Sequence, residues 1–139
     1  MQIQPQSLQI TSILFFVSFC YFLLYSKKNI TEIILGILIF ITFIISQLFW
    51  YNPIQYSTIH QIDALIAKTT FISFVIYILF IKNLSSSVFF FSLLLIITSF
   101  YLFFLSNHYS TIEWCSINHI IYHGLAHIFS FVSSIYAFV

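Results

Sequence analysis

The chain has 139 residues, enough for one domain, and its composition excludes most classes of soluble protein. Hydrophobic residues make up 61% and charged residues only 5%, whereas soluble proteins carry about 25% charged residues. With four Lys or Arg residues in total and a net charge of +1, the chain is not expected to bind nucleic acid. The remaining class is an integral membrane protein, with residues 1–139 forming a single transmembrane domain.

Five apolar runs follow one another along the chain, each long enough to cross a hydrocarbon core about 30 Å thick as a helix. They cover residues 8–25, 30–51, 59–81, 88–105 and 112–139. Short polar segments at 26–29, 52–58, 82–87 and 106–111 separate them. Connections this short make sequential helices run antiparallel. The sequence therefore predicts an all-α, multi-pass bundle of about five transmembrane helices.

The lysines predict how this bundle is oriented in the membrane. Lys27 and Lys28 lie between the first two runs, and Lys82 follows the third, so all three fall on one face of a five-helix bundle. Cytoplasmic loops are enriched in Lys and Arg. We therefore expect the N-terminus outside or in a lumen and the C-terminus in the cytoplasm; the identity of the membrane is not predicted.

Three histidines recur every four residues at the start of the last run. His119, His123 and His127 therefore share one side of a helix, about a turn apart. Two imidazoles spaced in this way can bind one metal ion. The alternative interpretation is that each imidazole forms hydrogen bonds with a neighbouring helix or with a backbone carbonyl. His127, two turns from His119, is expected to support the site rather than to bind a metal.

The third run begins with a second polar pair. His60 and Asp63 are three residues apart and share a helix face. Asp63 is interpreted either as a capping residue at the start of the helix or as a metal ligand, a partner of a ligating histidine or a general base. In a five-span topology this pair lies in the same leaflet as His119 and His123. The sequence thus predicts one polar pocket lined by the second, third and fifth spans.

The other polar residues receive simpler interpretations. Lys68 is expected to extend toward the membrane surface or to pair with Asp63 or Glu113. Glu32 and Glu113 are interpreted as acids in the first turns of the second and fifth spans, and His108 as a solvated loop residue.

The pattern of polar residues resembles the CREST superfamily of membrane hydrolases, which includes alkaline ceramidases, progestin and adiponectin receptors and haemolysin-III proteins. The family pattern is Ser-x-x-x-His, a later Asp, and His-x-x-x-His in the last helix. Ser46, Asp63, His119 and His123 match it within residues 42–70 and 112–139. Trp50 stands where the family has its first zinc histidine, and this chain has five predicted spans rather than seven.

The resemblance implies a zinc-dependent hydrolase that cleaves a lipid amide or ester within the bilayer. His119 and His123 would be metal ligands, and His60 is inferred from its position to supply the third. Asp63 would orient water or take its proton, and Ser46 would polarise the scissile carbonyl. Membrane lipids, including a lipid substrate such as a ceramide, are the partners that this interpretation implies.

Two other functions remain open from the sequence. Low charge and short loops are also typical of a non-enzymatic subunit in a larger membrane complex with protein partners. Alternatively, two histidines on facing helices could serve as axial ligands of haem b. In that case His60 or His108 would have to face one of the histidines in the last span.

Overall fold

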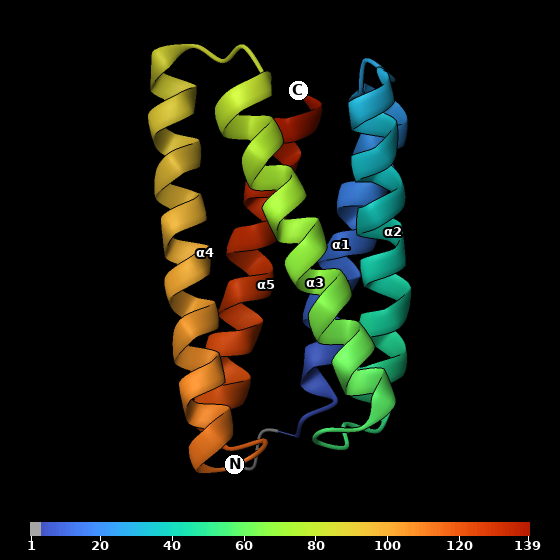
Figure 1. Cartoon of the computed structure of the whole chain (residues 1–139), viewed down its shortest axis with the longest axis vertical. Coiled ribbons are helices and arrows are strands. Elements are labelled where there is room, and N and C mark those ends of the chain that lie inside the picture. Colours follow the sequence, from blue (N-terminus) through green and yellow to red (C-terminus); the bar gives the residue numbers. More distant parts are fainter. Residues whose placement is uncertain (1–3) are drawn as a thin grey trace.

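A computed structural model describes residues 4–139 and divides them into five long helices (Figure 1). These are α1 (Ser7–Tyr25), α2 (Ile30–Tyr51), α3 (Thr58–Ile76), α4 (Ser86–Ile112) and α5 (Ile117–Phe138). A π-helical segment, η1 (Tyr77–Ile81), continues α3. Each helix, with η1 counted as part of α3, is long and apolar enough to cross a membrane. No strand occurs in residues 4–139, so the predicted all-α, multi-pass bundle is confirmed.

The boundary between the last two spans differs from the prediction. Residues 106–111, expected to form a loop, belong to α4, and α5 begins at Ile117. Polar side chains in this stretch bond back to their own helix: Ser110 Oγ donates to the Asn107 carbonyl at 2.7 Å, and Thr111 Oγ1 donates to the His108 carbonyl at 2.7 Å. These bonds satisfy the hydroxyls without ending the helix. His108 is therefore an exposed helical residue, and Glu113 follows α4 instead of opening α5.

The helices form a ring that is open on one side. Packing runs from α4 to α5, then to α1, α2 and α3. α3 and α4 are joined by a short loop, yet they do not pack along their lengths. Figure 1 shows α3 crossing obliquely, beside α4 near their connection and beside α2 at its other end. This arrangement leaves the interior of the ring to be enclosed by side chains between α3 and α4.

Small polar residues lie in the interior, and large apolar residues cover the outside. Ser18 of α1 and Ser134 of α5 share a hydrogen bond of 2.6 Å, and Thr42 of α2 and Thr70 of α3 share one of 2.8 Å. All four residues are buried. Helices in a bilayer associate through close packing and such polar contacts, because lipid gives no hydrophobic drive for one helix to bury another. The distribution is therefore that of a membrane protein.

One glycine sets the closest approach between α1 and α2. A Cβ atom at Gly36 would lie 2.6 Å from ring carbons of Phe22, which is itself buried against Phe138. Any larger residue at this position would require the Phe22 ring to shift. At Gly124 of α5 the nearest neighbour of such an atom would be a Leu8 methyl group at 3.4 Å, an ordinary contact distance.

Candidate functional site

A cavity of about 710 Å³ occupies the interior of the ring. Its walls are mainly aromatic and aliphatic, with polar groups concentrated toward the connections between α2 and α3 and between α4 and α5. The five residues singled out from the sequence all line it: Ser46, His60, Asp63, His119 and His123. The cavity also extends along α4, which was not expected to contribute. The structure therefore brings these residues to one cavity, while their chemical roles stay predictions.

His60 is held by a compact turn at the start of α3. Ser57 is the N-cap, and its hydroxyl accepts a hydrogen bond from the backbone N–H of His60 at 3.2 Å. The His60 ring reaches back, and its Nδ1 accepts a hydrogen bond from the backbone N–H of Tyr56 at 2.9 Å. Tyr56 adopts a left-handed conformation with φ of 61°. The arrangement is similar to a capping box, except that histidine replaces the usual Glu or Gln and accepts from the residue before the N-cap instead of from the N-cap.

The same arrangement recurs at the start of α5. Ser116 caps the helix and accepts from the backbone N–H of His119 at 3.3 Å. His119 Nδ1 accepts from the backbone N–H of Cys115 at 3.1 Å, and Cys115 has φ of 60°. The chain thus contains two copies of one local structure, a left-handed residue followed by Ser-x-x-His. We call the two copies Ser-x-x-His boxes.

Aromatic rings hold the two boxes together. The Trp114 ring lies 5.0 Å from the His60 ring and 4.9 Å from the His119 ring, measured between centroids. Its indole N–H donates to the Pro53 carbonyl at 3.0 Å. The Phe49 ring stacks on His60 at 4.9 Å with an interplanar angle of 9°. Both imidazoles are therefore fixed by packing as well as by their hydrogen bonds.

Trp50 occupies the adjoining wall of the cavity. Its ring lies 6.1 Å from that of His119 and 5.0 Å from that of His123. The side chain is only 1% exposed, and its indole N–H has no hydrogen-bond partner in residues 4–139. A buried Trp usually finds a partner for this group. Trp50 is therefore an unsatisfied donor beside two of the three candidate metal ligands.

The remaining histidines continue the stripe toward the middle of α5. His123 Nδ1 lies 3.0 Å from Ser106 Oγ, and His127 Nδ1 lies 2.9 Å from Thr11 Oγ1. Thr11 Oγ1 also lies 3.1 Å from the Leu8 carbonyl oxygen, within hydrogen-bonding distance. His127 therefore anchors α5 to α1, in line with the supporting role expected for it.

Asp63 and Ser46 face the cavity from α3 and α2. Both are buried, with exposed fractions of 7% and 3%, and the Ser46 hydroxyl lies close enough to interact with the Asp63 carboxyl. Lys68 also lines the cavity but is exposed and forms no ion pair with Asp63 or Glu113. Of the two alternatives expected for Lys68, the ion pair does not form within residues 4–139, and the side chain is exposed.

The donor set does not fit a zinc ion held by His60, His119 and His123. A neutral imidazole that accepts a hydrogen bond at Nδ1 carries its proton at Nε2 and has no lone pair there for a metal. Ligating histidines normally donate their second ring N–H to an acceptor instead. Within residues 4–139, no group of three or more His, Cys, Asp or Glu side chains is placed to bind an ion. His108, weighed as a haem ligand, is exposed and is not part of the cavity wall.

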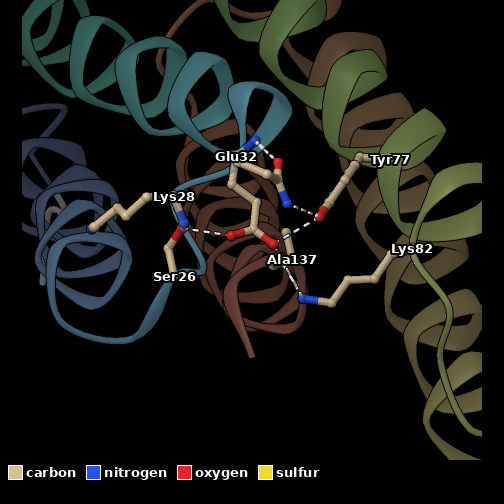
Figure 2. Close-up of polar contacts among 7 residues, drawn as sticks. Ser26, Lys28, Glu32, Tyr77, Lys82 and Ala137 are labelled. Carbon is tan, nitrogen blue, oxygen red and sulfur yellow. Dashed lines mark hydrogen bonds and ion pairs between the residues drawn. The ribbon is translucent and has the colours of Figure 1, made fainter.

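A second polar cluster, which the sequence interpretation missed, lies at the opposite end of the bundle (Figure 2). Glu32 is 1% exposed and accepts hydrogen bonds from Ser26 Oγ at 2.6 Å and from the Tyr77 hydroxyl at 2.7 Å. Lys82 Nζ lies 3.8 Å from the same carboxylate and donates to the Ala137 carbonyl at 2.7 Å. Glu32 is thus a buried junction between α2, η1 and α5 rather than only a first-turn acid.

The π-helical turn of η1 explains why this cluster forms. The backbone N–H of Lys82 bonds to the Tyr77 carbonyl, a separation of five residues, instead of to a carbonyl four residues back. The wider turn brings the side chains of Tyr77 and Lys82 to the same carboxylate. Burial lowers the pKa of Lys82 below its ordinary value, and the nearby Glu32 partly offsets this. No sequence signal marks a π-turn, although a Glu at one helix end and a Lys at another could have suggested the pair.

Comparison with known proteins leaves the ancestry of the chain open. No protein-family model matches it, and no curated protein or solved structure was found to match it. The resemblance to the CREST superfamily therefore stays a prediction from the residues that carry it.

Proposed function

We propose that this multi-pass membrane protein binds a hydrocarbon chain of a membrane lipid in its interior cavity. The observation that carries the proposal is the shape of the open ring. Ile72 of α3 and Phe100 and Phe104 of α4 line the cavity, and these side chains are 56%, 66% and 62% exposed. The cavity therefore opens between α3 and α4, whose backbones do not pack along their lengths, although the rings of Phe71 and Phe103 meet edge to face there. A lipid chain is the apolar ligand available at that opening.

The dimensions of the cavity suit one such chain. Its volume of about 710 Å³ falls in the range of about 300–1,000 Å³ that is usual for small-molecule sites. On α5 its lining runs from His119 to Ser134, a distance of about 22 Å at 1.5 Å per residue. The bound chain would lie along the helices, with its polar group beside the Ser-x-x-His boxes.

Filling the cavity tests this proposal. Ala67→Phe places a large ring on the cavity wall of α3, whereas Leu65→Phe changes an outward-facing residue of the same helix that is absent from the wall. Binding of a fluorescent or photoactivatable fatty-acyl probe should fall at least tenfold in Ala67→Phe and stay unchanged in Leu65→Phe. Equal binding by both variants would refute the proposed location.

A lipid amide or ester hydrolase is the second candidate function. It is favoured by one observation, the placement of a buried carboxyl and a hydroxyl, Asp63 and Ser46, on the wall of a lipid-accessible cavity. Asp63 would take a proton from water, and Ser46 would polarise the carbonyl. The histidine geometry gives zinc no support, so elemental analysis for zinc and iron is the first test. Release of fatty acid from lipid amides or esters by the wild type, abolished in Asp63→Asn, would establish hydrolysis.

The orientation and assembly of the protein belong to the same proposal. We place the loops that carry Lys27, Lys28 and Lys82 in the cytoplasm, following the positive-inside tendency. The Ser-x-x-His boxes then lie in the outer or lumenal leaflet. Assembly with other membrane subunits is a further alternative, and mass measurement of the protein in native nanodiscs distinguishes it from a monomer.

A further inference from the structure

We propose that the two Ser-x-x-His boxes and Trp50 form a metal-free site that binds the carbonyl oxygen of the lipid through hydrogen-bond donors. The inference rests on the proposed lipid binding and names the chemistry that the polar end of the cavity recognises. In this proposal the N–H groups of His60, His119 and Trp50 take the place of a metal ion.

The boxes determine which ring nitrogen faces the ligand. In each box a backbone N–H donates to Nδ1, so neutral His60 and neutral His119 both carry the proton on Nε2. Neither Nε2–H has a hydrogen-bond partner in residues 4–139, and both side chains line the cavity. Two imidazoles with the same fixed tautomer thus offer two N–H donors at one end of the cavity.

The surrounding helices favour a negative partial charge at the same place. His60 and His119 lie in the first turns of α3 and α5, and both helices are longer than eight residues. The N-terminal end of a helix carries a partial positive charge. Two such ends point to the side of the bundle where the donors lie, which favours an acceptor oxygen over an apolar group.

Trp50 gives independent evidence that a ligand belongs here. Its ring forms part of the cavity wall between His119 and His123, and its buried indole N–H has no protein partner. A buried donor without a partner is destabilising, so natural proteins seldom leave one. An acceptor supplied by the ligand would satisfy it, after a small adjustment of the wall that now covers the nitrogen.

Asp63 narrows the class of ligand. This carboxyl lines the same cavity, one helical turn beyond His60, and is itself buried, so an ionised carboxylate or phosphate beside it would lose most of its hydration. It can accept a hydrogen bond from a hydroxyl or an amide N–H. The ligand is therefore an uncharged lipid with a carbonyl oxygen close to such a hydrogen, for which a monoacylglycerol is a simple probe.

A pair of matched probes tests the inference in the full-length protein with a metal chelator present. Monoolein has an ester carbonyl, and 1-O-oleylglycerol is the ether that lacks it. We expect monoolein to bind about tenfold more tightly, and His119→Phe to remove this preference while leaving affinity for the ether unchanged. His108→Phe, an exposed site outside the cavity, is the control and should keep the preference. Equal affinity for the two probes overturns the carbonyl site alone, whereas binding of neither overturns the lipid cavity as well.

A second experiment determines the histidine tautomers in the wild-type protein, so it does not require a substituted protein to fold. ¹⁵N NMR of the histidine-labelled wild type should show Nε2 protonated and Nδ1 unprotonated for two imidazoles, with no change when zinc is added. Protonated Nδ1 in the rings of His60 and His119, or stoichiometric binding of zinc, would overturn a metal-free site.

Discussion

Removing the Glu32 carboxylate should destabilise the fold more than any surface charge change. Glu32→Ala leaves the Ser26 and Tyr77 hydroxyls without their acceptor and Lys82 without its counter-ion. Breaking a buried ion pair by deleting one partner costs about 3–5 kcal/mol. Glu32→Gln retains an acceptor oxygen but loses the charge. A hydrogen bond to a charged group contributes about 1.5–3 kcal/mol, against about 1 for a neutral one. Because Glu32→Gln affects two such bonds, we expect it to lower the free energy of unfolding by about 2 kcal/mol.

The assay is reversible unfolding in mixed micelles with increasing SDS, which reports the free energy of unfolding. Glu113→Gln is the control, because Glu113 is exposed and has no ionic partner in residues 4–139; its effect should stay within about 0.5 kcal/mol. A double-mutant cycle with Lys82→Met should give a coupling of about 1 kcal/mol or more with Glu32→Ala. A cost below about 1 kcal/mol for Glu32→Ala, or a coupling of zero, would refute the view that this cluster ties the helices together.

Two further predictions concern packing and topology. Gly36→Ala should lower the free energy of unfolding by about 1–3 kcal/mol, because its methyl group would overlap the Phe22 ring. Gly124→Ala should leave the free energy of unfolding unchanged or raise it by up to about 1 kcal/mol. Thermal unfolding of both variants in one detergent compares them, and equal shifts in Tm would contradict the packing described. The topology is tested with single cysteines at Ser57 and Asn83, in a protein whose native cysteines have been replaced. The two cysteines should react with an impermeant maleimide from opposite sides of the membrane. Labelling of both from the same side would refute the five-span topology.

The fold could be predicted from the sequence because lipid imposes a length and an apolar composition on each span. The positions of the helix ends were harder to predict from hydropathy. The polar residues at 106–111 suggested a loop, yet a hydroxyl such as that of Ser110 is satisfied by its own helix, and hydropathy cannot distinguish the two cases. The π-turn at Tyr77 has no compositional signature either, so the Glu32 cluster was not anticipated.

The candidate site was predictable in place but not in chemistry. Helical spacing and topology placed His60, Asp63 and His119 on one side of the bundle, and all three line one cavity. Spacing does not determine which ring nitrogen carries a proton. That depends on the N–H groups of Tyr56 and Cys115, which point at the imidazoles only because both residues adopt a left-handed conformation.

The contact between the first and last helices has a consequence for how the protein is made. Thr11 and Ser18 of α1 find their partners, His127 and Ser134, 116 residues further along the chain. During synthesis the hydrogen bonds between α1 and α5 therefore cannot form until α5 has emerged from the ribosome. Until then the Thr11 and Ser18 hydroxyls must bond to their own helix. Truncation before α5 should leave α1 packed on α2 alone, so we expect such nascent chains to be preferred substrates of membrane quality-control proteases.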